Sequence, residues 1–286
     1  MTPPGRARPV PASMTWDDLT RRPRSRADAT IAYGDDRLQV VDVWRPAGAG
    51  PFRTVLMVHG GCWQTAIADR SLMDWVAADL RDAGYAVWNI DYRGVDRAGG
   101  AYPGIFLDAA RAADALRDHA VPFAFDLRRI VAVGHSAGAH LALWLAARRN
   151  LPAGSVLAGG DPLRIDHVVA LGGMPDLEAV AASPDNGCGT DVVADLVGAA
   201  TDARPDRYAD TSVPRLLPLG VPQDLINGRE DRIVPFRFGT AYADQARAAG
   251  DPVALHEIAA TGHVELIAPG SAAWATAKAL IAGAFA

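Results

Sequence analysis

The sequence predicts an α/β fold, in which a mostly parallel central sheet carries helices on both faces. Short apolar strands alternate with helical segments along most of the chain, which is typical of a parallel sheet covered on both sides. In addition, a buried strand runs directly into Gly134-His135-Ser136-Ala137-Gly138, and an apolar helix follows. This order of strand, tight glycine turn and helix places Ser136 at the carboxyl edge of the sheet.

The first half of the chain supplies three of the predicted strands. Residues 1–14 are rich in Pro, Arg and Ala without periodicity, and we expect a flexible leader there, followed by a single domain over 15–286. Gly84 ends the first long helix, because glycine readily adopts the left-handed conformation found at helix ends. The elements predicted in this half are strands at 38–44, 54–58 and 86–90 and helices at 69–83 and 103–119.

One segment of the second half differs from the rest. Residues 176–220 contain short helical pieces and several Pro and Gly, but no clean strand. We expect a cap-like insertion over the carboxyl edge of the sheet, where open α/β sheets bind their ligands. The other elements predicted in this half are strands at 130–133, 168–171, 222–228 and 253–258 and helices at 139–147, 236–249 and 271–284.

Composition excludes several classes of protein. The 286 residues are 50% apolar, enough for a sizeable core, and the net charge of −5 argues against nucleic-acid binding and charge-driven membrane binding. Lys278 is the only lysine and falls in a helical pattern, which largely excludes Schiff-base chemistry and a serine–lysine dyad. No apolar run approaches a membrane span and no secretory signal is visible, so we expect a soluble, cytoplasmic protein.

The two cysteines, Cys62 and Cys188, are too few for a disulfide framework or a zinc site. We expect each to pack as a small buried residue, and the sequence predicts no metal site. Cys62 could alternatively be a thiol nucleophile, which would need a lowered pKa and a histidine of its own. His59 is near in sequence, but no second triad is visible.

Ser136 is the predicted nucleophile. A serine on so tight a turn is held in a strained backbone conformation, and side chains two residues before and after it would collide with neighbouring backbone. This requirement explains why Gly134 and Gly138 are both glycine. The alternative is a glycine-rich turn that carries an idle serine.

His263 is the predicted general base. In this architecture the base follows the nucleophile late in the chain, beyond the end of a strand. Of the seven histidines, only His256 and His263 are late enough. His256 falls inside the predicted strand 253–258, whereas His263 lies just past the carboxyl end of that strand.

The acid that orients the base should follow a strand between Ser136 and His263. Glu230 and Asp231 lie in such a loop, and we choose Asp231, partly because its position relative to Gly228 matches the family pattern described below. Its carboxylate would fix the imidazole tautomer and stabilise the charged imidazole as it forms. The alternative role for a carboxylate at this position is to cap the following helix. Asp176, which follows the preceding strand, is the reserve acid.

A tetrahedral intermediate also needs hydrogen-bond donors for its oxyanion. The N–H of Ala137 is one predicted donor, because it lies at the positive end of the helix after Ser136. The other donor should come from the segment His59 to Trp63 (HGGCW), whose consecutive glycines let main-chain N–H groups face the substrate. Gly61, and after it Cys62, are the predicted donors; the alternative is a merely flexible turn.

Taken together, these motifs resemble the α/β-hydrolase superfamily. The segment 59–63 resembles the HGGxW motif of the kynurenine formamidase (arylformamidase) group and its esterase neighbours. The resemblance covers about residues 28–285 and includes Asp91-Tyr92-Arg93 and the acid loop Gly228-x-x-Asp231.

The resemblance implies an α/β-hydrolase fold and a serine hydrolase with Ser136, Asp231 and His263 as its triad. It implies neither a metal nor an organic cofactor. HGGxW is shared by esterases and amidases, so the expected substrate is a small molecule with a carboxylic ester or an aryl-formamide bond. Two alternatives stay open: a small-peptide or amide hydrolase, and a catalytically silent binding module with this fold.

Four residues are predicted to contact the substrate. Trp63, Tyr92 and Tyr102 follow strand ends or begin a helix, where they could line an aromatic pocket. Arg93 could pair with a substrate carboxylate. The alternatives are ordinary packing for the aromatic residues and a salt bridge for Arg93. The sequence leaves both a monomer and a homodimer open.

Overall fold

The structure, a computed structural model, describes residues 13–286 and is built on one eight-stranded sheet. Its strands are β1 (Ala29–Ala32), β2 (Val40–Trp44), β3 (Phe52–Val58), β4 (Ala86–Ile90), β5 (Phe125–His135), β6 (His167–Leu171), β7 (Gln223–Gly228) and β8 (Val253–Ile258). They lie in the order β1-β2-β4-β3-β5-β6-β7-β8. β1 pairs with β2 and β2 with β4 in antiparallel fashion, and all the other pairs are parallel. The mostly parallel sheet predicted from the sequence is therefore confirmed.

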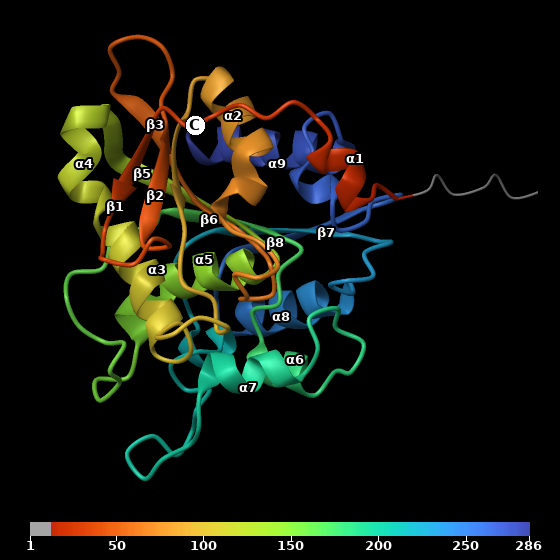
Figure 1. Ribbon diagram of the computed structural model, residues 1–286. Coiled ribbons are helices and arrows are strands. Elements are labelled where there is room, and N and C mark those ends of the chain that lie inside the picture. The colour runs from red at the N-terminus through yellow and green to blue at the C-terminus, as the bar shows by residue number, and fades with distance from the viewer. Residues whose placement is uncertain (1–12) are drawn as a thin grey trace, which may run out of the picture.

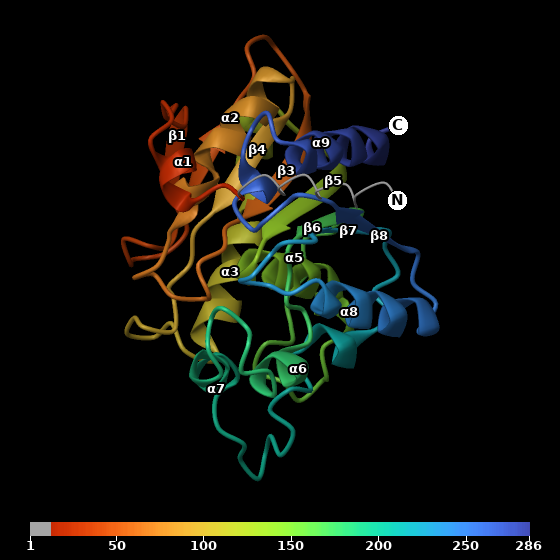
Figure 2. The ribbon, with the colours of Figure 1, turned by 90° about the vertical axis from the view of Figure 1, so that its right-hand side faces the viewer.

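Helices cover both faces of this sheet (Figures 1 and 2). The α-helices are α1 (Trp16–Thr20), α2 (Asp74–Asp82), α3 (Gly104–Asp114), α4 (Leu116–Phe123), α5 (Ala137–Ala147), α6 (Leu177–Ala181), α7 (Asp191–Val197), α8 (Arg237–Ala248) and α9 (Ala272–Ala284). Short 3₁₀ turns occur at η1 (Arg70–Met73), η2 (Arg148–Asn150), η3 (Val213–Leu216) and η4 (Glu265–Ile267). In both views α2 and α9 lie on one face, and α3, α5 and α8 lie on the other.

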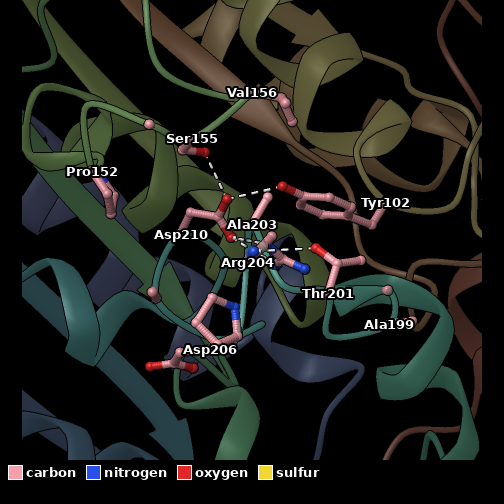
Figure 3. A pocket seen from close by; sticks show the side chains of 14 residues that line it. Tyr102, Pro152, Ser155, Val156, Ala199, Thr201, Ala203, Arg204, Asp206 and Asp210 are labelled. Atoms are coloured by element: carbon pink, nitrogen blue, oxygen red, sulfur yellow. Dashed lines mark hydrogen bonds and ion pairs between the residues drawn. The ribbon is translucent and has the colours of Figure 1, made fainter.

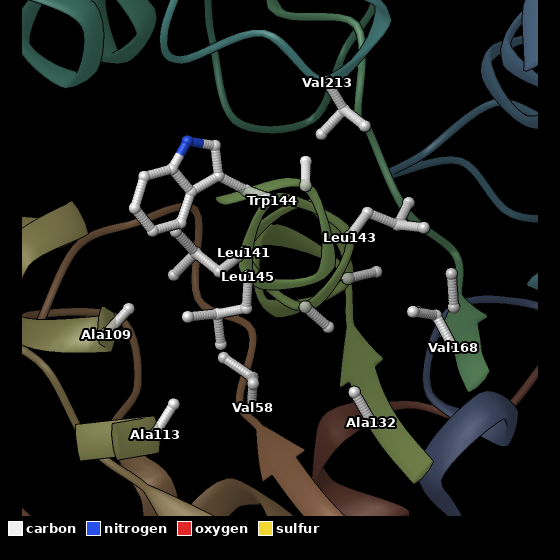
Figure 4. Packing of buried hydrophobic residues seen from close by; sticks show 14 of the residues in the cluster. Val58, Ala109, Ala113, Ala132, Leu141, Leu143, Trp144, Leu145, Val168 and Val213 are labelled. Carbon is white, nitrogen blue, oxygen red and sulfur yellow. The ribbon is translucent and has the colours of Figure 1, made fainter. Parts of the chain in front are cut away.

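Each face of the sheet has its own buried apolar layer. On one side Trp75 of α2 and Trp274 of α9 pack in the same cluster as Met57 of β3. On the other side α5 is the central helix, and every residue in it except Ala146 is buried. Figure 4 shows why: strand residues such as Val58 lie on one side of α5, and Val213 lies on the opposite side. A helix enclosed in this way must be apolar all round, as its sequence is.

The elements agree with the sequence-based predictions in type, and they differ mainly in extent. The strand predicted at 86–90 is β4 without change, whereas the helix predicted at 103–119 is divided at Ala115 into α3 and α4. β1 was not predicted, because it is short and only partly buried along its length. Tertiary packing decides such boundaries, and local pattern does not.

The segment 176–220 contains α6, α7 and η3. In Figures 1 and 2, α6 and α7 lie outside the layer formed by α5 and α8, away from the sheet. Over residues 13–286, no helix combines the length and the apolar character needed to cross a membrane. The predicted leader falls largely on residues 1–12, which lie outside the described residues.

Candidate active site

Ser136 occupies the turn between β5 and α5, with φ 55° and ψ −122°. A positive φ is uncommon for a residue other than glycine and indicates local strain. A Cβ atom added to Gly134 would lie 2.2 Å from the carbonyl oxygen of Gly138, and one added to Gly138 would lie 2.2 Å from that of Val58. The predicted need for glycine at both positions is therefore confirmed.

His263 and Asp231 come together beside this turn, from the loops that follow β8 and β7. Nδ1 of His263 and Oδ2 of Asp231 are 2.6 Å apart, and both side chains are buried. The other carboxylate oxygen of Asp231 accepts the N–H groups of Ile233 and Val234 at 2.9 and 2.8 Å. Because these bonds fix the carboxylate as an acceptor, Nδ1 of His263 must carry the ring proton. Nε2 is then the nitrogen with a free lone pair.

Ser136 and His263 both line a cavity of about 250 Å³. The cavity wall is largely apolar, and it includes two of the predicted oxyanion-hole residues. The remaining residues that line it are Trp16, Gly61, Cys62, Ile67, Ala68, Leu72, His135, Gly187 and Ile233.

The HGGCW loop lies directly against Ser136. A Cβ atom added to Gly60 would lie 2.9 Å from Cβ of Ser136, so this close approach requires glycine. Gly61 and Cys62 both have positive φ, 111° and 51°. Within residues 13–286, the N–H groups of Gly61 and Cys62 take part in no hydrogen bond. The N–H of Ala137 belongs to the first turn of α5, where it has no intrahelical acceptor. Unsatisfied donors of this kind can bind an oxyanion.

A buried polar network holds the HGGCW loop from behind. Nε2 of His59 and Oδ1 of Asp91 are 3.0 Å apart, while Nη1 of Arg70 donates to Oδ2 of Asp91 at 2.9 Å. The ring of Tyr92 stacks on His59 at 4.3 Å between centroids, and its hydroxyl donates to the His59 carbonyl at 2.8 Å. Tyr92 therefore packs against the HGGCW loop, and it does not line the cavity that contains Ser136.

The other three predicted substrate-binding residues also lie away from this cavity. The indole N–H of Trp63 donates to Nδ1 of His140 at 3.2 Å, with Trp63 fully buried. The Arg93 side chain makes two hydrogen bonds to Asp108, from Nε at 2.7 Å and from Nη2 at 2.8 Å. Tyr102 lines a different cavity.

That second cavity is larger, about 590 Å³, and Asp210 organises its polar groups (Figure 3). Asp210 accepts hydrogen bonds from Tyr102 Oη at 2.9 Å, Ser155 Oγ at 2.6 Å and Arg204 Nε at 3.0 Å. The Arg204 guanidinium also lies over the Tyr102 ring, 3.7 Å from its centroid. Tyr102, Ser155, Arg204 and Asp210 are thus paired with one another.

The expectation for the cysteines was wrong. Cys62 and Cys188 form a disulfide, with Cα atoms 5.3 Å apart although 126 residues separate them in sequence. The bond joins the HGGCW loop to the segment 176–220, next to Gly187 in the cavity wall. Two isolated cysteines carry no sequence signal for pairing, because only the fold brings them within bonding distance.

Two aromatic residues that line the cavity, Trp16 and His135, were not predicted as site residues. Trp16 lies edge-on to the rings of His135 and His263, with centroids 6.4 and 6.2 Å away. Nε2 of His135 lies 3.2 Å from the carbonyl oxygen of His263. Burial, and then the neighbouring His263, lower the pKa of His135 well below its usual value, so this side chain is neutral. The position of His135 inside the GxSxG motif could have indicated that it lies at the site. No sequence motif indicates this for Trp16.

A serine on a strained strand-to-helix turn, with a histidine and a carboxylate from two later parallel strands, defines the class as an α/β-hydrolase. Residues 41–245 match the model of the BD-FAE family. The match covers more than half of the chain, so the chain belongs to the BD-FAE family, an esterase family of the α/β-hydrolase superfamily.

Individual relatives agree with this family. The chain is 28% identical over 242 residues to esterase LipC of Mycobacterium tuberculosis. The aligned region covers 82% of this chain and 58% of LipC. A truncated carbohydrate esterase from gut microbiota is similar in structure, with TM-score 0.72, 20% identity and coverage of 91% of this chain and 96% of that one. Esterase B of Lactobacillus rhamnosis gives TM-score 0.72 at 18% identity, covering 92% and 87%. At these identities the two structures show a shared fold.

Proposed function

We propose that this protein is a serine carboxylesterase, which hydrolyses small ester substrates through an acyl-enzyme on Ser136. One observation carries the proposal: a strained serine, a histidine bonded to a buried carboxylate and unsatisfied N–H groups all meet at one small cavity. The family match and the esterase relatives support the same class of reaction.

In the first half of the reaction, Nε2 of His263 takes the proton of the Ser136 hydroxyl as its oxygen attacks the ester carbonyl. The bond to Asp231 stabilises the positive charge that this transfer places on the imidazole. The oxyanion that forms accepts hydrogen bonds from Ala137 and from Gly61 or Cys62. His263 then gives its proton to the alcohol oxygen, and the ester C–O bond breaks.

In the second half, water replaces the serine as nucleophile. His263 takes a proton from water, whose oxygen attacks the acyl carbon, and the same N–H groups stabilise the second oxyanion. Collapse of this intermediate releases the carboxylic acid and returns the proton to Ser136. Each oxyanion donor contributes about 3 kcal/mol to the stabilisation of the transition state.

An ester is favoured over the aryl-formamide of an amino acid as substrate. Such a formamide carries a carboxylate, and Arg93, the residue expected to bind it, is paired with Asp108. The cavity of about 250 Å³ is also smaller than the roughly 300–1,000 Å³ of pockets that bind drug-sized ligands. A small, largely apolar acyl ester fits both observations.

Replacement of Ser136 by alanine tests the proposal. We expect Ser136→Ala to lower kcat for p-nitrophenyl acetate by at least about 10⁴-fold, and to abolish labelling by a fluorophosphonate probe. Ser155→Ala is the matched control, because Ser155 lines the second cavity. Wild-type turnover in Ser136→Ala contradicts the proposal, and absence of both turnover and labelling in the wild type favours a binding module.

The expected cytoplasmic location stays a prediction, and the disulfide argues against it. Disulfides persist in oxidising compartments and are rare in reducing cytosol. We therefore favour an oxidising compartment, which mass spectrometry of the alkylated native protein would test through the state of Cys62 and Cys188. A homodimer likewise stays a prediction, which light scattering would test.

A further inference from the structure

We propose that Trp16 selects the alcohol part of the ester and favours aromatic alcohols over small aliphatic ones. Trp16 belongs to an N-terminal arm, which we define as residues 13–22. The inference rests on the proposed esterase function and adds to it a residue far from the predicted triad in sequence. Neither the HGGxW motif nor the GxSxG motif includes this arm.

The position of Trp16 relates it to the alcohol and not to the acyl group. His263 must lie within hydrogen-bond reach of the leaving oxygen in order to protonate it, so the alcohol group extends past the His263 ring. Trp16 packs edge-on to that ring at 6.2 Å and lines the same cavity. Ala68, by contrast, adjoins Gly61 on the oxyanion side, since a Cβ atom on Gly61 would lie 2.9 Å from its Cβ.

The arm is held in place at both ends. The N–H of Met14 donates to Oε1 of Glu265 at 2.6 Å, and the other oxygen of Glu265 accepts the N–H of Gly262 at 3.1 Å. Glu265 thus ties the arm to the loop that carries His263. At the far end, Nη1 of Arg22 donates to the carbonyl of Pro269 at 2.8 Å.

The helix of the arm is also fixed. Thr15 and Asp18 form a reciprocal capping box at the start of α1, and Leu19 is fully buried against the core. These contacts hold Trp16 at a fixed position beside His263, and the indole ring is therefore a preorganised wall of the cavity.

The surface of Trp16 is available to a substrate. Four large apolar side chains are exposed in the described residues, Trp16, Ile67, Val121 and Val156, and the first two line this cavity. Trp16 is 37% exposed although its indole ring presents a large apolar surface. An aromatic alcohol can cover this ring with favourable ring–ring geometry, which a methyl or ethyl group cannot.

The test varies the alcohol and the acyl group separately. With the acyl group kept as acetyl, we expect Trp16→Ala to lower kcat/KM for phenyl acetate about tenfold and that for ethyl acetate less than about twofold. The ratio of the two, compared with the same ratio in the wild type, removes the difference in intrinsic reactivity. With p-nitrophenol as the fixed alcohol, the preference between acetate and butyrate should stay unchanged.

Two further variants make the result specific. Trp16→Phe keeps an aromatic wall and should recover most of the phenyl acetate activity. Val121→Ala removes an exposed apolar side chain on α4 and should leave every rate unchanged. Equal losses on both acetates, or a changed acetate-to-butyrate preference, overturns the inference. If the wild type hydrolyses none of these esters, the proposed function itself has failed.

Discussion

The cavity that contains Ser136 and the cavity that contains Asp210 differ in how their polar groups are satisfied. The larger, about 590 Å³, contains an aspartate that accepts hydrogen bonds from a tyrosine, a serine and an arginine. The smaller, about 250 Å³, contains a serine at positive φ and backbone N–H groups without acceptors. Of these two, volume alone would favour the larger cavity as the active site. Strain and unsatisfied donors cost stability and cluster at functional sites, so they favour the smaller cavity as the candidate active site.

The larger cavity is better explained as a joint between segments. Asp210 connects Tyr102, which precedes α3, with Ser155 in the loop after η2 and with Arg204 in the segment 176–220. Because Asp210 is almost fully buried, these bonds replace the water it has lost. We therefore expect a substitution at the smaller cavity to lower kcat, and a matching substitution at the larger cavity to lower the free energy of unfolding.

The largest difference is expected between two aspartates. Asp231→Asn should lower kcat about 10³- to 10⁴-fold, because an amide stabilises neither the correct tautomer nor the charge on His263. Its stability should change little, since the remaining oxygen can still accept the N–H groups of Ile233 and Val234. Steady-state kinetics and thermal unfolding measure the two effects.

Asp210→Asn should show the opposite pattern. It leaves the Arg204 guanidinium without its charged partner, and we expect a loss of about 3 kcal/mol in the free energy of unfolding. Its kcat should stay within about twofold of the wild type. A large fall in kcat for Asp210→Asn without loss of stability would show that the second cavity takes part in catalysis.

An effect that depends on pH should come from His140, which links the two regions. Its Nδ1 accepts from Trp63 of the HGGCW loop, and its Nε2 donates to the carbonyl of Thr211, next to Asp210. Burial lowers the pKa of His140 to about 4. Between pH 6.5 and 4 the unfolded chain therefore binds a proton that the folded protein does not.

The sign of this effect follows directly. The stabilisation by neutral His140 is complete above pH 6.5 and is lost as the pH falls towards 4, by about 3 kcal/mol in total. Urea unfolding at pH 7, 5.5 and 4.5 should show the wild type losing more stability than His140→Gln, whose side chain does not titrate. Parallel pH profiles for the two proteins would contradict this assignment.

The smallest effect is expected for Tyr102→Phe. The change removes one of the three side-chain donors to Asp210 and should cost about 1 kcal/mol in the free energy of unfolding. Because Tyr102 lies outside the cavity with Ser136, kcat/KM should be unchanged. A rise in KM would restore Tyr102 as a substrate-binding residue, as the sequence suggested.

Much of the fold and the local parts of the site could be predicted from the sequence. Ser136 with its two glycines, and the HGGCW loop, are short motifs whose geometry follows from neighbouring residues. His263 and Asp231 could be placed because chain order and strand ends restrict the choice. The structure brings these residues together, and their catalytic roles stay proposals.

The parts that could not be predicted depend on contacts between distant segments. Cys62 and Cys188 are 126 residues apart, and Trp16 reaches His263 from the opposite end of the chain. No local pattern indicates either contact. Tyr92 was wrongly predicted for the same reason. Its position after a strand suggested that it lines a substrate pocket, whereas its ring packs against His59.

The disulfide has a consequence for how this protein should be handled. Because Cys62 and Cys188 enclose a loop that contains β4, β5 and α5, the bond restricts the unfolded chain over nearly half of its length. For a loop of this size, the chain-entropy model gives a stabilisation of about 5 kcal/mol. Material produced in a reducing host, or stored with a thiol reagent, lacks that contribution. Its melting temperature and any turnover then describe the dithiol form and not the native protein.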